Sequence, residues 1–173
     1  MSKSEIQIRP AIAEDAEIIH AMVFALAEST GMAGMVRSSP DDFRRYGFGE
    51  PKCFECLIAE QDGQPLGLCL YFFSFSSWFG KRGVYVQDIY VDSAARGTGL
   101  GKRLLAETAR RAAEKGAAFM RLAVDKDNQK ARAFYEHVGM VQADHDIIYK
   151  AWDEDFIALQ KLAGNPVTRE KKS

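Results

Sequence analysis

The chain has 173 residues and a formal net charge of −1. A chain of this length fits one domain that buries its core without metals or disulfides, so we expect one domain over residues 1–165 and a charged C-terminal tail over 166–173. The net charge gives no support to nucleic acid as the main partner. No segment has the ~20 apolar residues of a membrane span, and the N-terminus lacks a signal peptide pattern. We therefore expect a cytoplasmic protein with neither a nucleic-acid nor a membrane partner.

Apolar periodicity and turn residues predict alternating strands and helices along the chain. Strands are expected at Ile6–Pro10, Phe54–Glu60, Pro65–Ser74, Gly83–Val91, Ala118–Val124, Val141–Ala143 and Ile147–Trp152. Helices are expected at Glu14–Leu26, from Pro40 onward, and at Gly99–Lys115, Asn128–His137 and Asp153–Leu162. An Asp-Gly turn over 61–64 joins two strands as a hairpin, and the intervening helix makes the strands ending at Val91 and starting at Ala118 parallel. The fold class is α/β, with helices on the faces of a mixed sheet.

Three cysteines, Cys53, Cys56 and Cys69, bear on metal and redox chemistry. The first two have the C-x-x-C spacing of redox and zinc sites, but no second such pair or histidine pair accompanies them. Alternation along a strand would direct these two side chains to opposite faces. The three histidines show no ligand-like spacing. We expect buried or half-buried free thiols and no metal, and a redox role of the pair stays open.

The stretch from Asp88 to Leu105 has the pattern of a strand, a glycine-rich turn and a helix. Arg96 stands beside three alternate glycines, Gly97, Gly99 and Gly101. Bare amides at the positive end of a helix dipole form an anion site, most naturally for phosphates. A Walker loop would need a glycine at position 96, and a dinucleotide fingerprint would need one at position 102, where Lys102 stands. The remaining pattern is R-x-x-G-x-G between a strand and a helix.

This turn, Arg96-Gly97-Thr98-Gly99-Leu100-Gly101, resembles the acetyl-CoA pyrophosphate loop of the GCN5-related N-acetyltransferase (GNAT) superfamily. The strand Tyr85–Val91 before it and the segment Asn128–Glu136 after it resemble that family too, and Asn128 is expected to cap the helix that follows it. The resemblance implies a mixed, mostly antiparallel central sheet flanked by helices, with acetyl-CoA as co-substrate. It implies a cofactor site of Ile89, Tyr90, Val91, Arg96, Gly97, Thr98, Gly99, Leu100, Gly101, Lys102, Asn128, Ala131 and Tyr135.

Most of the chain resembles the diamine (spermidine/spermine)–thialysine branch of that superfamily. The residues that carry this resemblance are Arg9-Pro10-Ala11, Leu26-Ala27-Glu28, Gly47-Phe48-Gly49-Glu50, Cys56-Leu57-Ile58-Ala59-Glu60, Trp78-Phe79-Gly80-Lys81 and Gln87-Asp88-Ile89-Tyr90-Val91. The branch implies a homodimer that acetylates a primary amine of a small molecule, such as thialysine, a lysine-like amino acid, a diamine or a polyamine. The alternatives are a non-catalytic acyl-CoA-binding sensor, or an acetyltransferase for an aminoglycoside or a protein lysine.

The reaction needs a proton acceptor, because an alkyl ammonium of pKa ~10.4 must lose a proton before it attacks a thioester. The branch usually has a glutamate where Gln87 stands, and an amide holds a water but does not act as a base. Either a water chain anchored by Gln87 and Glu28 takes the proton, or the substrate is not of the polyamine type. A backbone N–H of Ile89–Val91 is the oxyanion donor. Tyr135, from the family's Phe-Tyr motif, is the general acid, with a core packing role as its alternative.

The resemblance also implies a substrate side made of Glu28, Trp78, Gln87 and Asp88. Glu28 ends the first helix, where the family places a carboxylate toward a cationic substrate; its alternative is an ordinary solvated carboxylate. Trp78 either stacks on the substrate or seals the dimer interface. Ser76 takes a place that is acidic in the family, which favours a shorter amine or an amino-acid side chain over a polyamine. Alternation along the strand predicts that Gln87 and Asp88 face opposite sides.

Overall fold

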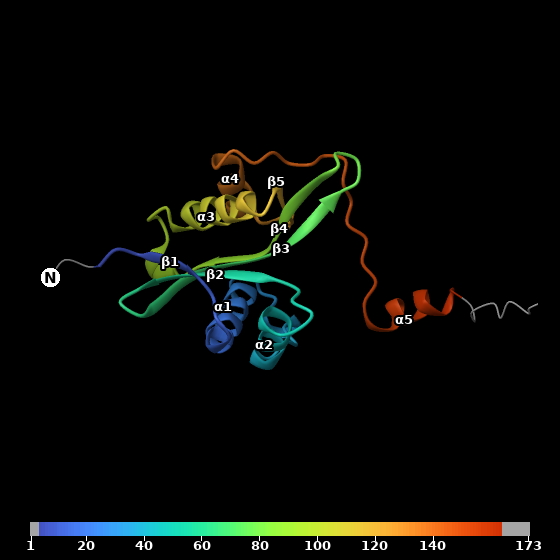
Figure 1. Ribbon diagram of the computed structural model, residues 1–173, viewed down its shortest axis with the longest axis horizontal. Helices are drawn as coiled ribbons and strands as arrows, with labels where there is room; N and C mark the ends of the chain where they lie inside the picture. The colour runs from blue at the N-terminus through green and yellow to red at the C-terminus, as the bar shows by residue number, and fades with distance from the viewer. Residues whose placement is uncertain (1–3, 164–173) are drawn as a thin grey trace, which may run out of the picture. The chain divides into compact units, whose positions relative to one another are not determined.

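The computed structural model describes residues 4–163 of the chain (Figure 1). The chain divides into two compact units, residues 1–132 and 133–173. The predicted tail over 166–173 and the predicted domain end at 165 lie outside the described residues, so the single-domain organisation stays a prediction. No helix within residues 4–163 combines the length and the apolar composition needed to cross a membrane.

The first unit contains a five-stranded sheet in the order β1-β2-β3-β4-β5. Its strands are β1 Gln7–Pro10, β2 Glu55–Gln61, β3 Gln64–Ser76, β4 Lys81–Val91 and β5 Ala117–Leu122. Neighbouring strands are antiparallel except β4 and β5, which run parallel because a helix connects them. The mixed, mostly antiparallel sheet is therefore confirmed.

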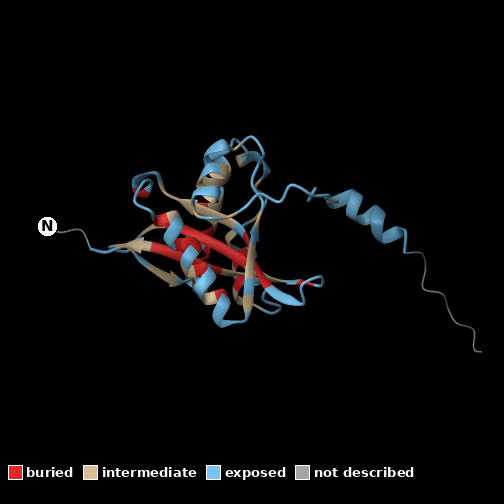
Figure 2. Ribbon diagram, turned by 90° about the horizontal axis from the view of Figure 1, so that it is seen from above, coloured by how far each residue is buried: buried red, intermediate tan, exposed pale blue. Residues whose placement is uncertain are grey.

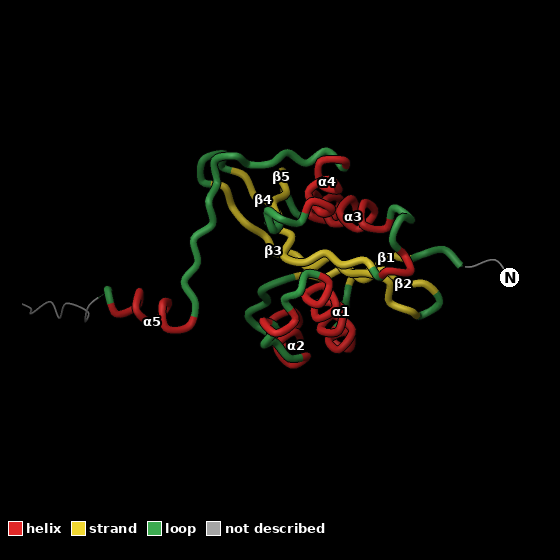
Figure 3. The backbone as a smooth tube through the Cα atoms, turned by 180° about the vertical axis from the view of Figure 1, so that it is seen from behind, coloured by secondary structure: helices red, strands yellow, loops and turns green. Residues whose placement is uncertain are grey.

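Helices cover both faces of this sheet (Figures 1 and 3). Two helices, α1 Ala16–Ser29 and α2 Pro40–Phe48, lie on one face, and α3 Leu100–Glu114 lies on the other. Short 3-10 turns precede or follow them at η1 Ala13–Asp15, η2 Ala33–Met35 and η3 Ser93–Ala95. Two further helices, α4 Gln129–His137 and α5 Asp153–Lys161, come later in the chain, and α4 crosses the boundary between the two units.

The core lies on both sides of the central strands, where Figure 2 shows most of the buried residues. On the α1 and α2 side, one cluster of buried residues consists of Ala16, Ile19, Met22, Phe43, Cys56, Ile58, Leu68 and Leu70. On the other side, α3 buries the five residues that its helical spacing predicts, namely Leu100, Leu104, Leu105, Thr108 and Ala112. Because burying one large aliphatic side chain contributes about 1.5–3 kcal/mol, the buried leucines of α3 hold this helix against β3 and β4.

The strands β3 and β4 form a long hairpin, and β4 leads into the glycine-rich turn. The preceding turn has positive φ at Asp62 (52°) and Gly63 (75°), the conformation that the predicted Asp-Gly hairpin requires. Pairing of β3 with β4 extends to Ser76 and Lys81, so the loop between them shortens to residues 77–80. The predicted end of β3, at Ser74, was two residues too early, and the predicted start of β4, at Gly83, was two residues too late. Pairing between the two strands extends them beyond what local propensity indicates.

The strands predicted at Val141–Ala143 and Ile147–Trp152 are wrong. The structure has no strand anywhere between residues 138 and 152, which Figure 3 draws as loop. Val141, Ile147 and Tyr149 are 91%, 80% and 90% exposed. A strand is stable only where a partner edge accepts its hydrogen bonds, and no strand among residues 4–163 pairs with this segment. Apolar alternation alone therefore did not decide its structure.

Candidate functional site

The glycine-rich turn connects η3 to α3 with an open backbone. Gly97 and Gly99 have φ of 79° and 80°, a region that other residues avoid. A Cβ atom at either glycine would meet no heavy atom within 4 Å, so both positions border open space. The Thr98 hydroxyl donates to the Ala95 carbonyl at 2.7 Å and holds the turn closed on its inner side. The turn thus presents a bare, preformed backbone surface.

The first turn of α3 has the charge pattern of an anion site. Its first backbone hydrogen bond runs from the Arg103 amide to the Gly99 carbonyl, so the three preceding amides have no partner inside the helix. No acidic residue stands in that turn. Arg96 and Lys102 are exposed beside it, and Arg96 donates through Nε to the Val91 carbonyl at 3.2 Å. Exposed amides, the helix dipole and two cations together fit a pyrophosphate group.

The strand β4 parts from β5 just before this turn. Pairing between the two ends at Val86 and Leu122, although β4 continues to Val91. Beyond that point, the β5-facing edge of Ile89–Val91 has no strand partner among the described residues. Backbone N–H groups on such an edge can bind an extended amide-containing chain or a carbonyl oxygen.

A β-bulge at Gln87 determines which way the neighbouring side chains point. Leu70 is opposite Asp88, but Tyr71 is opposite Val86, so Gln87 is the extra residue. Directly opposed residues share a face of the sheet, and Leu70 belongs to the buried cluster under α1 and α2. Asp88 therefore faces the α1 and α2 layer, while Gln87 is exposed. Simple alternation along β4 would assign Asp88 to the opposite face, because the extra residue shifts the alternation of side chains by one.

The Asp88 carboxyl group is half-buried and isolated. Desolvation by burial raises its pKa. Tyr90, which packs against the same buried cluster, donates its hydroxyl to Asp92 at 3.3 Å. The negative charge of Glu28, exposed at the end of α1, also reaches Tyr90 and raises its pKa, after burial and Asp92. The structure therefore brings Glu28, Tyr90 and Asp88 to one side of the sheet.

Asp92 is a positioning residue that the sequence analysis missed. Its carboxylate accepts from the Ala94 amide at 2.8 Å, which caps η3, and from the Tyr90 hydroxyl. It thereby fixes the chain where β4 gives way to the glycine turn. The signal was present in the sequence, because an Asp before Ser-Ala-Ala is a typical N-cap.

Trp78 lies apart from these residues. It is in the 77–80 loop at the tip of the β3–β4 hairpin and is 94% exposed. Asp88 pairs with Leu70, and the six residue steps from Leu70 to Ser76 span about 20 Å at ~3.3 Å per residue. Within one chain, a small amine cannot contact both Asp88 and Trp78. The two predicted roles of Trp78, in stacking on the substrate or at a dimer interface, stay predictions.

The helix α4 carries the remaining predicted cofactor residues. The Asn128 side chain accepts from the Ala131 amide at 3.1 Å, so the predicted helix cap is confirmed. Asn128 and Ala131 belong to the first unit. Tyr135 belongs to the second unit, is half-buried, and has its ring 5.3 Å from that of Phe134. Its role as a general acid stays a prediction.

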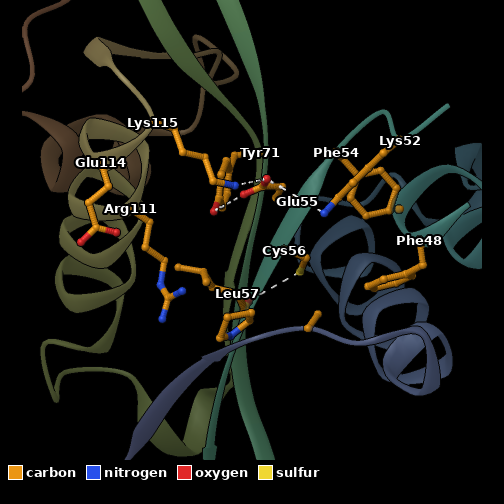
Figure 4. Close-up of a pocket in the computed structure, with 13 residues that line it drawn as sticks. Phe48, Lys52, Phe54, Glu55, Cys56, Leu57, Tyr71, Arg111, Glu114 and Lys115 are labelled. Carbon is orange, nitrogen blue, oxygen red and sulfur yellow. Dashed lines mark hydrogen bonds and ion pairs between the residues drawn. The ribbon is translucent and has the colours of Figure 1, made fainter. Parts of the chain in front are cut away.

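A cavity of about 210 Å³ lies near the opposite end of α3 from the glycine turn (Figure 4). Glu55 lies at its upper wall, where it accepts from the Tyr71 hydroxyl at 3.0 Å and pairs with Lys115. Burial alone would raise the pKa of Glu55, but these hydrogen bonds outweigh it and lower that pKa. With α3 rising ~1.5 Å per residue, the cavity is about 20 Å from the turn. It is therefore a separate feature and not the cofactor site.

The three cysteines differ in burial. Cys53 is exposed, whereas Cys56 and Cys69 are buried, so the expectation of buried or half-buried thiols holds for two of the three. Burial raises the pKa of Cys69 to about 12, which keeps its thiol protonated. Within residues 4–163, no group of three or more His, Cys, Asp or Glu side chains could hold a metal ion.

Comparison with known proteins identifies the family. A thialysine N-epsilon-acetyltransferase of Bos taurus is 34% identical over 167 residues, which cover 92% of this chain and 98% of that one. The spermidine/spermine N(1)-acetyltransferase-like protein 1 of Homo sapiens is 35% identical over 111 residues, which cover 60% of this chain and 16% of that one. An integron cassette protein from the mobile metagenome of V. cholerae has a TM-score of 0.76 at 20% identity, covering 94% of this chain and 99% of that one, a likeness of fold alone.

The Acetyltransferase (GNAT) family matches residues 18–140, a range that includes β4, the glycine turn, α3 and α4. This match confirms the resemblance that the R-x-x-G-x-G turn indicates, and the family implies the use of acetyl-CoA. The open turn, the unpaired amides at the start of α3 and the absence of acids in its first turn fit that co-substrate. The chain belongs to the acetyltransferase (GNAT) family and is an N-acetyltransferase.

Proposed function

We propose that the protein transfers acetyl from acetyl-CoA, by direct attack, to a primary amine of a small molecule such as thialysine, a lysine-like amino acid or a diamine. The observation that carries this proposal is the 34% identity to a thialysine N-epsilon-acetyltransferase over nearly all of both chains. Two carboxylates on one side of the sheet, Asp88 and Glu28, support a cationic acceptor. They attract the ammonium group and orient it.

The co-substrate would be held by the turn and the β4 edge. Arg96 and the amides of residues 97–102 would bind its pyrophosphate. Ile89–Val91, Asn128 just before α4 and Ala131 within α4 would bind its pantetheine arm. Bound acetyl-CoA supplies an activated acetyl thioester. A backbone N–H of Ile89–Val91 then stabilises the negative charge that develops on the carbonyl oxygen. A tyrosine hydroxyl is ordinarily protonated at neutral pH, so Tyr135 would supply the proton that the sulfur requires.

An amine panel tests the proposal. The full chain is incubated with acetyl-CoA and thialysine, lysine, a short diamine, spermidine, an aminoglycoside or a lysine-containing peptide, and free thiol is followed. We expect the highest kcat/KM with thialysine, lysine or the diamine. Faster release with the aminoglycoside or the peptide would contradict the proposed substrate class. Thermal stabilisation by CoA with no thiol release from any amine would contradict turnover altogether.

We also propose that the protein forms a homodimer. The proposal rests on the resemblance to the diamine–thialysine branch, and it is supported by the exposed aromatic residues around the hairpin tip. Phe75, Trp78 and Phe79 are 70%, 94% and 70% exposed, and exposed aromatic clusters of this kind mark protein interfaces. A second copy would remove their apolar surface from water.

A further inference from the structure

On β4, the carboxylate of Asp88 lies next to Gln87, whose amide cannot act as a base. Asp88 is half-buried, and within residues 4–163 its carboxylate makes no hydrogen bond and no ion pair. Buried carboxylates that serve the fold are normally paired or hydrogen-bonded, because desolvating a charge is costly. An unpartnered one, beside the unpaired edge of β4, therefore needs another explanation.

The bulge determines the orientation of this carboxylate. Because Gln87 is the extra residue, Asp88 lies opposite Leu70 and Tyr90 lies opposite Leu68, on the face that α1 and α2 cover. Without the bulge, the strand would alternate from Val86 on the α3 face, so that Gln87 would lie on the α1 side and Asp88 would lie on the α3 face. The bulge thus moves a carboxylate, and not the neighbouring amide, into the half-buried layer under α1.

No positive charge shifts the titration of Asp88. Asp88 interacts electrostatically with the thiols of Cys56 on β2 and Cys69 on β3. On the same side of the sheet, Glu28 at the end of α1 interacts with Tyr90. Burial raises the pKa of both thiols, so they are neutral at physiological pH. Burial is also the cause that raises the pKa of Asp88, and this brings the carboxyl group closer in basicity to an amine.

We propose that Asp88 accepts the proton of the substrate ammonium group, a role that rests on the proposed amine acetylation. One N–H bond breaks, an O–H bond forms on Asp88, and the electron pair left on nitrogen forms the amide bond. The C–S bond breaks and sulfur takes the hydroxyl proton of Tyr135. The second proton lost from nitrogen restores that hydroxyl, and Asp88 releases its proton to water. One ammonium and one thioester thus give one amide, one thiol and one proton.

The gain from such an acceptor is large at neutral pH. An amine of pKa ~10.4 is neutral in roughly one molecule in 2,500 at pH 7. A positioned general base contributes about 10²–10⁴-fold in rate. An account in which Gln87 only orders water leaves the proton without a final acceptor in the protein, whereas Asp88 supplies one on the adjacent residue.

The test compares Asp88→Asn with wild type in the full chain, using an amine that wild type acetylates. We expect kcat at pH 7 to fall about 10²-fold or more, and the residual rate to rise about tenfold per pH unit toward the pKa of the amine itself. Adding Gln87→Glu to Asp88→Asn should restore the rate at least tenfold, because it returns a carboxylate to the same bulge. Glu114→Gln, on the surface of α3, is the matched control for a carboxylate-to-amide change.

Thermal unfolding gives a readout besides activity. A carboxyl group whose pKa is raised by folding destabilises the folded state above that pKa, and the penalty disappears as pH falls toward its unfolded value of ~3.9. Asp88→Asn should therefore melt at a higher temperature than wild type at pH 8, with the difference shrinking toward pH 4. A carboxylate that serves the fold would give the opposite sign.

Three results would overturn the role of Asp88. The first is a variant with unchanged kcat and a raised KM alone, which would make Asp88 only a binding group. The second is a lower kcat with the wild-type pH profile, and the third is a lower melting temperature at pH 8; both would indicate structural damage. If wild type itself acetylates no amine, the proposed function fails first, and the role of Asp88 fails with it.

Discussion

At the scale of single residues, the glycine turn depends on backbone conformation more than on side chains. Gly99 has a φ of 80° and is the N-cap residue of α3. An L-residue in this left-handed region costs roughly 1–2 kcal/mol. A side chain at this position would also occupy the open space that a pyrophosphate needs. A side chain at Gly99 would therefore both strain the backbone and obstruct the pyrophosphate.

Gly99→Ala should raise the KM for acetyl-CoA about tenfold or more and lower the free energy of unfolding by roughly 1–2 kcal/mol. The chain offers a matched control at the other end of α3. Gly116 has a φ of 84° and equally open surroundings, so Gly116→Ala should lose similar stability and keep its KM. Steady-state kinetics and urea unfolding of both variants make the comparison; an equal rise in KM for both would contradict a phosphate role for the turn.

Tyr135 has two interpretations that differ in kinetics. If it protonates the leaving thiolate, Tyr135→Phe should lower kcat about 10²-fold or more, a far larger change than in the affinity for CoA. If it only packs α4, the ring of phenylalanine should serve and kcat should stay within twofold. Tyr149→Phe, at a residue that is 90% exposed, is the control.

The residues also show what the sequence could not predict. The turn from Arg96 to Gly101 was predictable because its chemistry is local: alternate glycines, a cation and a following helix. The face of Asp88 was not, because it depends on the pairing of β4 with β3 and on one extra residue at Gln87. A bulge is a property of two strands together, and one strand's sequence carries little sign of it.

At the scale of elements, the connection from β1 to α1 depends on one ion pair. Arg9 donates to both carboxylate oxygens of Asp15, at 2.7 Å and 3.0 Å, and the Ile12 amide donates to the same group at 2.8 Å. Asp15 is only 4% exposed. The hydrogen bonds from Arg9 lower the pKa of Asp15 and outweigh the effect of burial. The pair anchors the start of α1, the helix that covers Asp88.

Asp15→Asn should lower the free energy of unfolding by about 1–3 kcal/mol at pH 7, less than for a fully buried pair because Arg9 is partly exposed. Since folding lowers the pKa of Asp15, its contribution is present above the unfolded value of ~3.9 and is lost as pH falls through the folded value. The difference from wild type should therefore shrink at pH 3. Urea unfolding at both pH values measures it, with exposed Asp41→Asn as the control; a difference that grows toward pH 3 would contradict the pair.

Element prediction succeeded where packing agrees with local pattern. The spacing of Leu100, Leu104 and Leu105 predicted both α3 and its buried side, and the Asp62-Gly63 turn predicted the β2–β3 hairpin. The pattern at residues 147–152 predicted a strand that does not form. Helices and tight turns are decided within a few residues, whereas a strand requires an edge elsewhere in the chain.

At the scale of the whole molecule, the hairpin tip bears on assembly. Trp78 is about 20 Å along the hairpin from the strand position of Asp88, which excludes a shared small substrate within one chain. We expect native mass measurement to give twice the mass of one chain. Trp78→Ser should shift that equilibrium toward one chain at micromolar concentration and leave the melting temperature of the single chain unchanged. An unchanged dimer together with a raised amine KM would instead favour substrate stacking.

The central claim is that acetyl passes directly from acetyl-CoA to a small amine. The most direct measurement incubates the full chain with acetyl-CoA labelled in the acetyl group, first alone and then with the best amine of the panel. We predict that the label stays on the co-substrate until the amine is added and then appears on the amine as free thiol is released, mole for mole. Label on the protein before the amine is added, or no label on any amine, would contradict the account.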